Sequence, residues 1–150
     1  MTELFSITEN YVKNHVKARH ENSKKGDNGI VLVVGGSTLY HGAPLLASLT
    51  ALRAGADLVY TAVPRIIINS IRSYSPNIIA LPMTDNSLTI GSANRLVKSL
   101  PKIPDTATIG MGMTISRAEA LSSLVKKLKE NGTRLVLDAS ALIPRIITEI

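Results

Sequence analysis

The fold class of this chain is decided by residues 31 to 64, VLVVGGSTLYHGAPLLASLTALRAGADLVYTAVP. The stretch opens inside a continuous β-branched run, IVLVV at 30–34, which is typical of a strand buried on both faces. An apolar helix over 43–56 follows, and Pro44 stands in its first turn, where proline is tolerated. A second strand over 58–63 completes the stretch. Strand, helix and strand in this order predict a βαβ unit with two parallel strands.

The alternation of strands and helices continues outward from this unit. Before it, we expect a short amphipathic helix over 8–19, capped by Thr8, and then a polar loop. After it, we expect helices over 65–74, 91–100 and 116–132 and strands over 77–82, 106–110 and 134–138. Ser116 and Glu119 match a capping box at the start of the last helix. The chain therefore predicts one α/β domain over 1–150, a three-layer α/β/α fold with a mostly parallel central sheet.

The composition narrows the class of protein. With 150 residues, 45% of them hydrophobic, the chain is long enough to bury the core of one domain. It has no cysteine, which excludes disulfides, thiol catalysis and cysteine-based zinc sites, and its three histidines form no metal-ligand pattern. It shows neither an apolar run of membrane-spanning length nor a basic signal-peptide start. We therefore expect a cytoplasmic protein without a membrane partner.

The net charge of +6 can be interpreted in two ways. It indicates either a surface that binds nucleic acid or a solvated basic surface that attracts small anions. The densest basic clusters are Lys24-Lys25 and 126–129. Neither is interleaved with aromatic side chains, which would form a stacking platform for bases. We favour the second reading and expect no nucleic-acid partner.

Small or acidic residues follow three of the predicted strands: Gly35-Gly36, the Gly-Met-Gly segment at 110–112, and Asp138. All strands of a parallel sheet end on the same edge, and ligands of open α/β sheets bind at that carboxyl edge. We therefore predict the ligand site there. The alternative is that these residues only break the strands and that Asp138 caps the next helix.

The glycine turn after the first strand matches neither standard phosphate loop. It has no Gly-Lys-Ser/Thr for a Walker loop, and its adjacent glycines, Gly35 and Gly36, do not fit G-x-G-x-x-G. Close approach of a ligand to the backbone is still allowed, because Gly42 and Ala43 also carry little or no side chain. The helix that begins near Ala43 aims free N–H groups at the same space.

Residues 25–64 resemble the N-terminal signature of the NAD(P)H-hydrate dehydratases, members of the ribokinase-like superfamily. The shared pattern is a Lys-Gly-Asp loop, a strand, Gly-Gly-Ser, Tyr, Gly-Ala, and a helix that ends in Leu-Arg-x-Gly-Ala. IGMGMTIS at 109–116 resembles the family's Ile-Gly-Pro-Gly-Leu segment, with Met111 in place of proline. LVLDASAL at 135–142 resembles its Leu-Asp-Ala-Asp-Ala/Gly-Leu segment, with Ser140 in place of the second acid.

This resemblance implies a ribokinase-like fold and repair of nicotinamide cofactors. Family members dehydrate hydrated NADH or NADPH at the expense of ATP or ADP, with Mg²⁺, and the phosphoryl group activates the hydroxyl that leaves. The resemblance also implies that Ala43 and Gly112 line the hydrated-nicotinamide site. The residues that we expect at the substrate site are Gly36, Ser37, Tyr40, Gly42, Ala43, Gly110, Gly112 and Asp138. We also expect a homo-oligomer, because family members form oligomers and helix 43–56 is apolar on nearly every face.

Two later motifs of the family, His-Pro-Gly-Glu and Gly-Thr-Gly-Asp, do not occur in these 150 residues. The second motif supplies an anion hole and the catalytic Asp. We therefore expect the catalytic base beyond Ile150 and take 1–150 as the N-terminal part of a longer ribokinase-like domain. We favour a surface role for His41 over a role as catalytic base. Two other functions stay open: a ribokinase-like kinase of a small alcohol or vitamin precursor, and a non-catalytic subunit with this fold.

Overall fold

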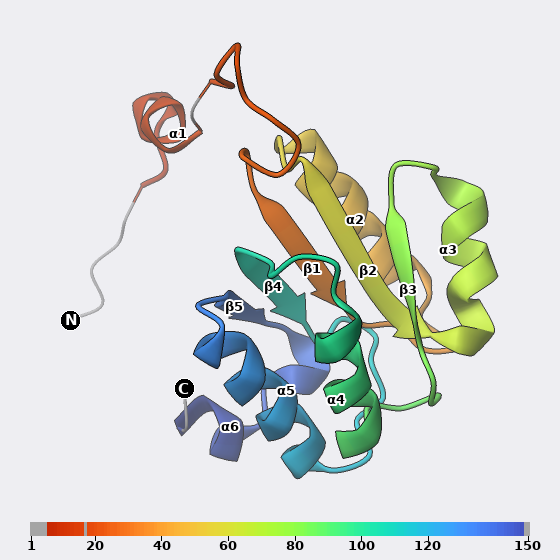
Figure 1. The fold of residues 1–150 in the computed structure, drawn as a ribbon. Helices are drawn as coiled ribbons and strands as arrows, with labels where there is room; N and C mark the ends of the chain where they lie inside the picture. The colour runs from red at the N-terminus through yellow and green to blue at the C-terminus, as the bar shows by residue number, and fades with distance from the viewer. Residues whose placement is uncertain (1–5, 17, 149–150) are drawn as a thin grey trace.

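A computed structural model describes residues 6–16 and 18–148 and places a five-stranded sheet between two layers of helices (Figure 1). The strands are β1 (Ile30–Val34), β2 (Leu58–Pro64), β3 (Ile79–Met83), β4 (Thr106–Ile109) and β5 (Arg134–Leu137). Their order is β3-β2-β1-β4-β5, and every neighbouring pair is parallel. The predicted three-layer α/β fold is therefore confirmed.

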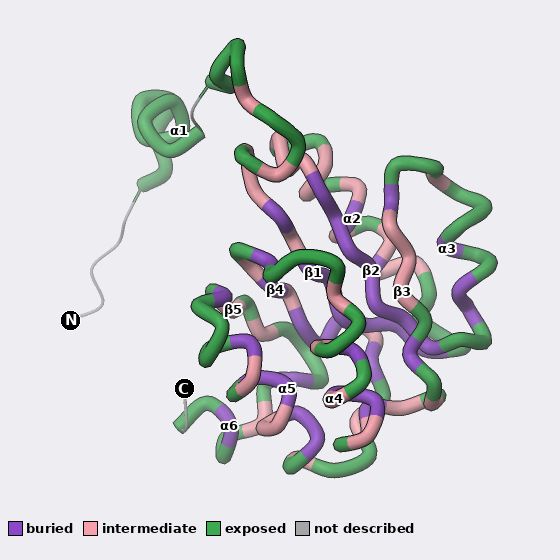
Figure 2. The backbone as a smooth tube through the Cα atoms, viewed as in Figure 1, coloured by how far each residue is buried: buried purple, intermediate pink, exposed green. Residues whose placement is uncertain are grey.

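The helices divide between the two faces of the sheet. One face carries α2 (Gly42–Arg53), the short 3-10 helix η1 (Arg65–Ile67) and α3 (Ile68–Tyr74). The other carries α4 (Ile90–Ser99), α5 (Ala118–Glu130), a 3-10 turn η2 (Ala139–Ala141) and α6 (Pro144–Thr148). The N-terminal helix α1 (Glu9–His15) stands away from both layers and buries none of its residues (Figures 1 and 2).

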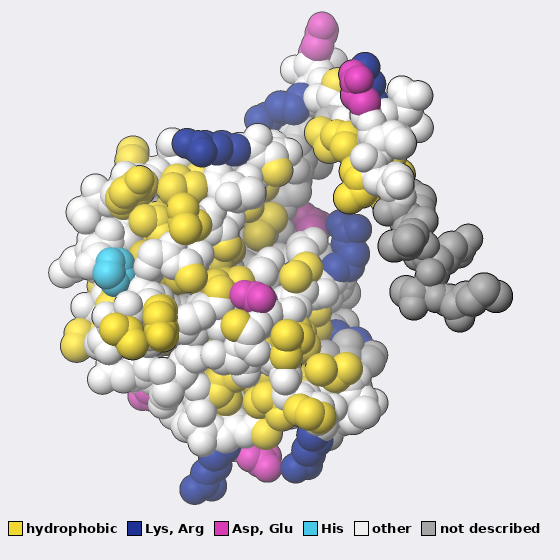
Figure 3. Space-filling view, turned by 180° about the vertical axis from the view of Figure 1, so that it is seen from behind, with side chains coloured by type: hydrophobic (Ala, Val, Ile, Leu, Met, Phe, Trp, Pro, Cys, Tyr) yellow, Lys and Arg dark blue, Asp and Glu magenta, His cyan; other side chains and the backbone are white. Residues whose placement is uncertain are grey.

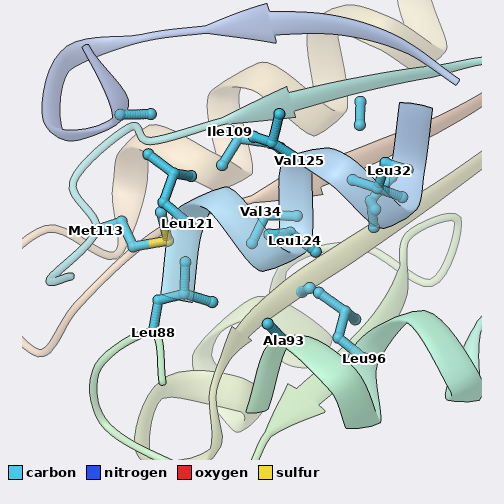
Figure 4. Close-up of a cluster of buried hydrophobic side chains, with 14 of the residues drawn as sticks. Leu32, Val34, Leu88, Ala93, Leu96, Ile109, Met113, Leu121, Leu124 and Val125 are labelled. Atoms are coloured by element: carbon cyan, nitrogen blue, oxygen red, sulfur yellow. The ribbon is translucent and has the colours of Figure 1, made fainter. Parts of the chain in front are cut away.

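The hydrophobic core follows the alternation of side chains along β1. Leu32 and Val34 pack on the α4–α5 side, where Leu121, Leu124 and Val125 of α5 meet the sheet (Figure 4). Val33 points to the opposite face and packs among the alanines of α2. Both faces of β1 are thus buried, as its unbroken apolar run predicts.

Helix α2 owes most of its apolar character to its own fold. One side, with Leu45, Leu49 and Leu52, packs against η1 and α3, and the alanine side packs against β1 and β2. The buried Ser48 hydroxyl donates to Pro44 O at 2.7 Å and lies 2.6 Å from Thr61 Oγ1. The outward residues are Leu46, Thr50 and Arg53. Burial within the chain therefore explains the composition of this helix, apart from Leu46.

The predicted helix ends are partly confirmed. Thr8 caps α1 as expected, and its side chain accepts from Tyr11 N at 3.2 Å, although the helix ends earlier than expected, at His15. The predicted capping box of α5 is wrong. Ser116 instead donates through Oγ to Leu88 O at 2.7 Å, because a parallel bridge between Leu88 and Ile115 holds this segment against a distant loop. Helix α5 begins at Ala118, with Arg117 rather than Ser116 in its N-cap position and without a side-chain cap.

The structure also bears on membrane association. No helix in the described ranges has the length and apolar content needed to cross a membrane. The cytoplasmic location stays a prediction.

Asp57 organises the loop that leads into β1, at the amino edge of the sheet. Its side chain is only 3% exposed. It accepts from Gly26 N at 2.9 Å, from Asn28 N and Asn28 Nδ2 at 3.0 Å each, and pairs with the Arg19 guanidinium. The backbone hydrogen bond from Asn28 is the main cause that lowers the pKa of Asp57 in the folded state, against the opposing effect of burial.

We expect Asp57→Asn to lower the urea midpoint of unfolding at neutral pH. A carboxyl whose pKa is depressed by folding stabilises the fold above its unfolded pKa of about 4, and this contribution is lost as the pH falls through the lower folded value. The difference in midpoint between wild type and variant should therefore shrink below about pH 4. A difference that stays constant from neutral pH into the acid range would show that ionisation of Asp57 contributes nothing.

Candidate functional site

The carboxyl edge of the sheet contains a topological switch point between β1 and β4. From β1 the chain adds β2 and β3 on one side, and it then crosses back to add β4 and β5 on the other. The loops after β1 and β4 therefore leave the sheet side by side, and the turn after β5 lies next to them. The space between loops at a switch point forms a crevice, and open α/β sheets bind their ligands in this crevice.

Glycines allow these three turns to pack against one another. A Cβ atom on Gly35 would lie 2.5 Å from Met111 O, and one on Gly112 would lie 2.6 Å from Tyr40 Cβ. A Cβ atom on Gly110 would overlap the carbonyl oxygen of Asp138. The backbone of Gly36 adds a hydrogen bond from its N–H to Met111 O at 2.8 Å. The absent side chains thus make room for protein atoms of the neighbouring turns.

A pocket of about 480 Å³ opens where the three turns meet. Its lining residues are Ser37, Thr38, Leu39, Tyr40, Ala43, Gly112, Met113, Thr114, Ala139 and Ser140. Ser37, Tyr40, Ala43 and Gly112 are among the predicted site residues, and the structure brings them together. The turn that carries the first two is closed by a hydrogen bond from Tyr40 N to Ser37 Oγ at 3.1 Å.

The other predicted site residues lie outside the pocket wall. Gly36 and Gly110 are buried in the packing of the turns, and the position of a Gly42 side chain is open space. Asp138 is exposed, and its carboxylate makes no hydrogen bond or ion pair within residues 6–16 and 18–148. Ligand contacts for these four residues stay predictions. The alternative cap role of Asp138 is not observed, because η2 has no side-chain cap.

His41 occupies the N-cap position of α2, but its side chain makes no capping hydrogen bond, is exposed and does not line the pocket. The geometry therefore gives no support to His41 as a base.

The pocket wall is uncharged, and it offers more apolar than polar surface. Its hydroxyl-bearing residues are Ser37, Thr38, Tyr40, Thr114 and Ser140, and Leu39 is the most exposed of its apolar residues. No lining residue carries a charge. Such a wall suits an uncharged group that offers hydrogen-bond partners and some apolar surface, rather than a bare phosphate.

Sequence reasoning missed several wall residues, notably Leu39, Thr114 and Ser140. Leu39 is 72% exposed beside the pocket, and a single exposed leucine gives no signal of a site. Thr114 and Ser140 each lie two residues after a predicted site residue, Gly112 and Asp138. Their proximity to those motifs was the only signal in the sequence.

A larger hollow of about 860 Å³ lies at the opposite, amino edge, between the segment around Arg19 and the loop over 26–29. Its wall includes Gly55, Asp105 and Arg134. By volume alone, this hollow would be chosen as the ligand site over the pocket at the carboxyl edge. The prediction of a ligand site at the carboxyl edge rests on the switch point there.

Within the described ranges, no group of three or more His, Asp or Glu side chains gathers closely enough to hold a metal ion. The carboxyl-edge pocket itself has no carboxylate in its wall.

Comparison with known proteins agrees with the resemblance. The family model of the NAD(P)H-hydrate dehydratases matches residues 31–148. The chain belongs to the NAD(P)H-hydrate dehydratase family. A relative from Nitrosopumilus maritimus, an ADP-dependent (S)-NAD(P)H-hydrate dehydratase, is 54% identical over 142 residues, which cover 95% of this chain and 50% of the relative. One of the same description from Cenarchaeum symbiosum is 48% identical over 144 residues, which cover 96% and 50% of the two chains.

Among solved structures, the ADP/ATP-dependent NAD(P)H-hydrate dehydratase of Bacillus subtilis, co-crystallised with ATP and Mg²⁺, superposes with a TM-score of 0.71 at 27% identity. The match covers 90% of this chain and 46% of that one. A ribokinase-like protein of Enterococcus faecalis shares the fold with a TM-score of 0.73 at 16% identity. The chain thus spans about half the length of the family members that it matches.

Proposed function

We propose that this chain takes part in nicotinamide-nucleotide repair, the dehydration of hydrated NADH or NADPH with ADP or ATP as co-substrate. Family membership over 31–148 supports the reaction. The observation that carries the assignment of the site is the uncharged, hydroxyl-rich pocket at the switch point. ADP is the favoured co-substrate, because the two relatives that are 54% and 48% identical to this chain over the aligned residues are described as ADP-dependent.

The pocket would hold the hydrated nicotinamide and its ribose. Both offer amide or hydroxyl groups to the hydroxyls of the wall, and the ring would lie near Ala43 and Gly112, as the sequence predicts. The phosphates would lie outside, since the wall has no cation. We assign Mg²⁺ to the phosphates of the nucleotide, because this ion binds through phosphates and a few carboxylates, and the pocket has none of the latter.

We further propose that 1–150 is the first part of a longer domain. β5 is an edge strand, and Thr108 and Val136, which share a face with Val33, lie on the α2 side of the sheet. Val136 is 50% exposed there. Parallel sheets are normally covered by helices on both faces. The relatives have about as much chain again, enough to extend the sheet past β5 and to cover this face.

The 150-residue chain should show no ADP- or ATP-dependent dehydration of hydrated NADH, followed by absorbance at the nicotinamide band. Phosphoryl transfer requires a base for the acceptor and preorganised positive potential around the moving phosphate. The pocket wall offers neither group. A longer polypeptide that adds the Gly-Thr-Gly-Asp segment should show the activity. Turnover by the 150 residues alone would mean that the base lies within them, and His41 would be the first residue to replace.

We also propose that the protein self-associates. Apolar side chains remain on the outer surface around α2 and η1, where Leu46 is 67% and Ile66 62% exposed. Figure 3, which views the molecule from behind, shows hydrophobic side chains spread over that face. We expect light scattering at micromolar concentration to give a mass above that of a monomer, and Leu46→Glu to shift it toward the monomer. A monomeric wild-type protein would contradict the proposal.

A further inference from the structure

Ala139 has an unusual backbone conformation beside the pocket. Its φ is 44°, the only positive φ at a non-glycine position in the described ranges. Residues with a Cβ atom rarely adopt this region, and such outliers persist where the surrounding structure holds them, often at ligand sites. Ala139 separates Asp138, which lies outside the pocket wall, from Ser140, which lies within it.

The turn around Ala139 is held firmly from both sides. Asp138 N donates to Ile109 O at 2.9 Å, and Ala141 N donates to Asp138 O at 2.9 Å. Ala141 is completely buried. The absent side chain of Gly110 leaves the space that Asp138 O and Ala141 occupy. These contacts fix the path of the chain, so the place of Ser140 in the wall does not depend on contacts of its own.

The Ser140 hydroxyl is not used by the fold. It makes no hydrogen bond with any residue that the structure describes, and the residue is exposed. In this it differs from Ser37, whose hydroxyl closes its own turn. Ser140 therefore combines a fixed position in the pocket wall with a donor and acceptor that are available to a ligand.

We propose that Ser140 is a ligand-binding residue, positioned by the left-handed Ala139, whose hydroxyl hydrogen-bonds an uncharged amide or hydroxyl group at the nicotinamide end of the nucleotide. The inference rests on the proposed function and adds a residue to its site. Because the contact joins two uncharged groups, it needs no cation in the pocket.

The test is calorimetric titration of the chain with two probes, NADPH and reduced nicotinamide mononucleotide, which share the nicotinamide end. Ser140→Ala should weaken both probes by the same factor, about 3- to 10-fold, as expected for the loss of one hydrogen bond between uncharged groups. Ser140→Thr keeps the hydroxyl and should stay within about 2-fold of wild type on the same scale. The control, Thr50→Ala on the outer side of α2, should match wild type.

Thermal unfolding separates a binding role from a structural one, because the hydroxyl has no partner in the described fold and Ser140→Ala should leave the melting temperature unchanged. The proposal is overturned if Ser140→Ala binds both probes as wild type does, or if only NADPH binding weakens, since the contact would then lie at the adenosine end. If wild type binds neither probe, the assignment of this pocket to the nicotinamide end is wrong, and this inference fails with it.

Discussion

Gly110→Ala should destabilise the fold more than any other glycine-to-alanine change in the described chain. The new Cβ atom would overlap the carbonyl oxygen of Asp138 and approach Ala141 N to 2.9 Å, and both are backbone atoms that cannot rotate away. The residue also has a φ of 124°, a conformation that L side chains rarely adopt. We expect a loss of more than about 3 kcal/mol in the free energy of unfolding, or failure to fold, because strain and overlap add.

Gly132→Ala is the matched control. Gly132 also has a positive φ, 82°, at the end of α5, but nothing lies within 4 Å of the position of its Cβ atom. Gly132→Ala should lower the free energy of unfolding by only about 1 kcal/mol, the cost of holding a residue with a Cβ atom in the left-handed conformation. Urea unfolding of both variants measures the difference. Equal losses would show that the turns at the carboxyl edge can separate at little cost, contrary to the packing described above.

Ala43→Leu should strongly weaken the binding of nicotinamide nucleotides. Ala43 lies in the first turn of α2 and forms part of the pocket wall, so a larger side chain would fill the space next to Gly112. We expect the dissociation constant for NADPH to rise at least tenfold, which corresponds to about 1.4 kcal/mol or more. The free energy of unfolding should fall by about 1–3 kcal/mol, because Ala43 also packs against the buried group of Val33, Val59 and Met111.

Thr50→Leu controls for this change, since it adds a leucine to the outward side of the same helix. Calorimetric titration with NADPH should give wild-type affinity for this control. Unchanged binding by Ala43→Leu would remove the pocket at the carboxyl edge from consideration as the nucleotide site.

The sequence predicts an element of the fold well where the element is one continuous apolar run that must be buried. β1 is found at its predicted residues, 30–34, because an unbroken β-branched run has few alternatives to a buried strand. The capping box at Ser116 fails for a tertiary reason. Its hydroxyl meets the carbonyl of Leu88, 28 residues earlier in the chain, and no local pattern reports such a partner.

The site is harder to predict, because it is assembled from three turns that are distant in the sequence. Gly35 and Gly110 stand out as glycines, but the sequence does not show whether a ligand or another turn occupies the space that they leave. The structure places Met111 and Asp138 there. Ser140 belongs to no sequence pattern that marks a site. It lies in the pocket wall directly after Ala139, whose backbone adopts a conformation that is rare for alanine.

The central claim is that the nucleotide binds in the pocket at the switch point. It is tested most directly by titrating the ¹⁵N-labelled chain with NADPH and mapping the amide chemical shifts that change. We predict the largest changes in the turns over 37–43, 112–114 and 139–140, which surround the pocket. Changes confined to 19–29, 54–55 and Arg134, around the hollow at the amino edge, would contradict this assignment.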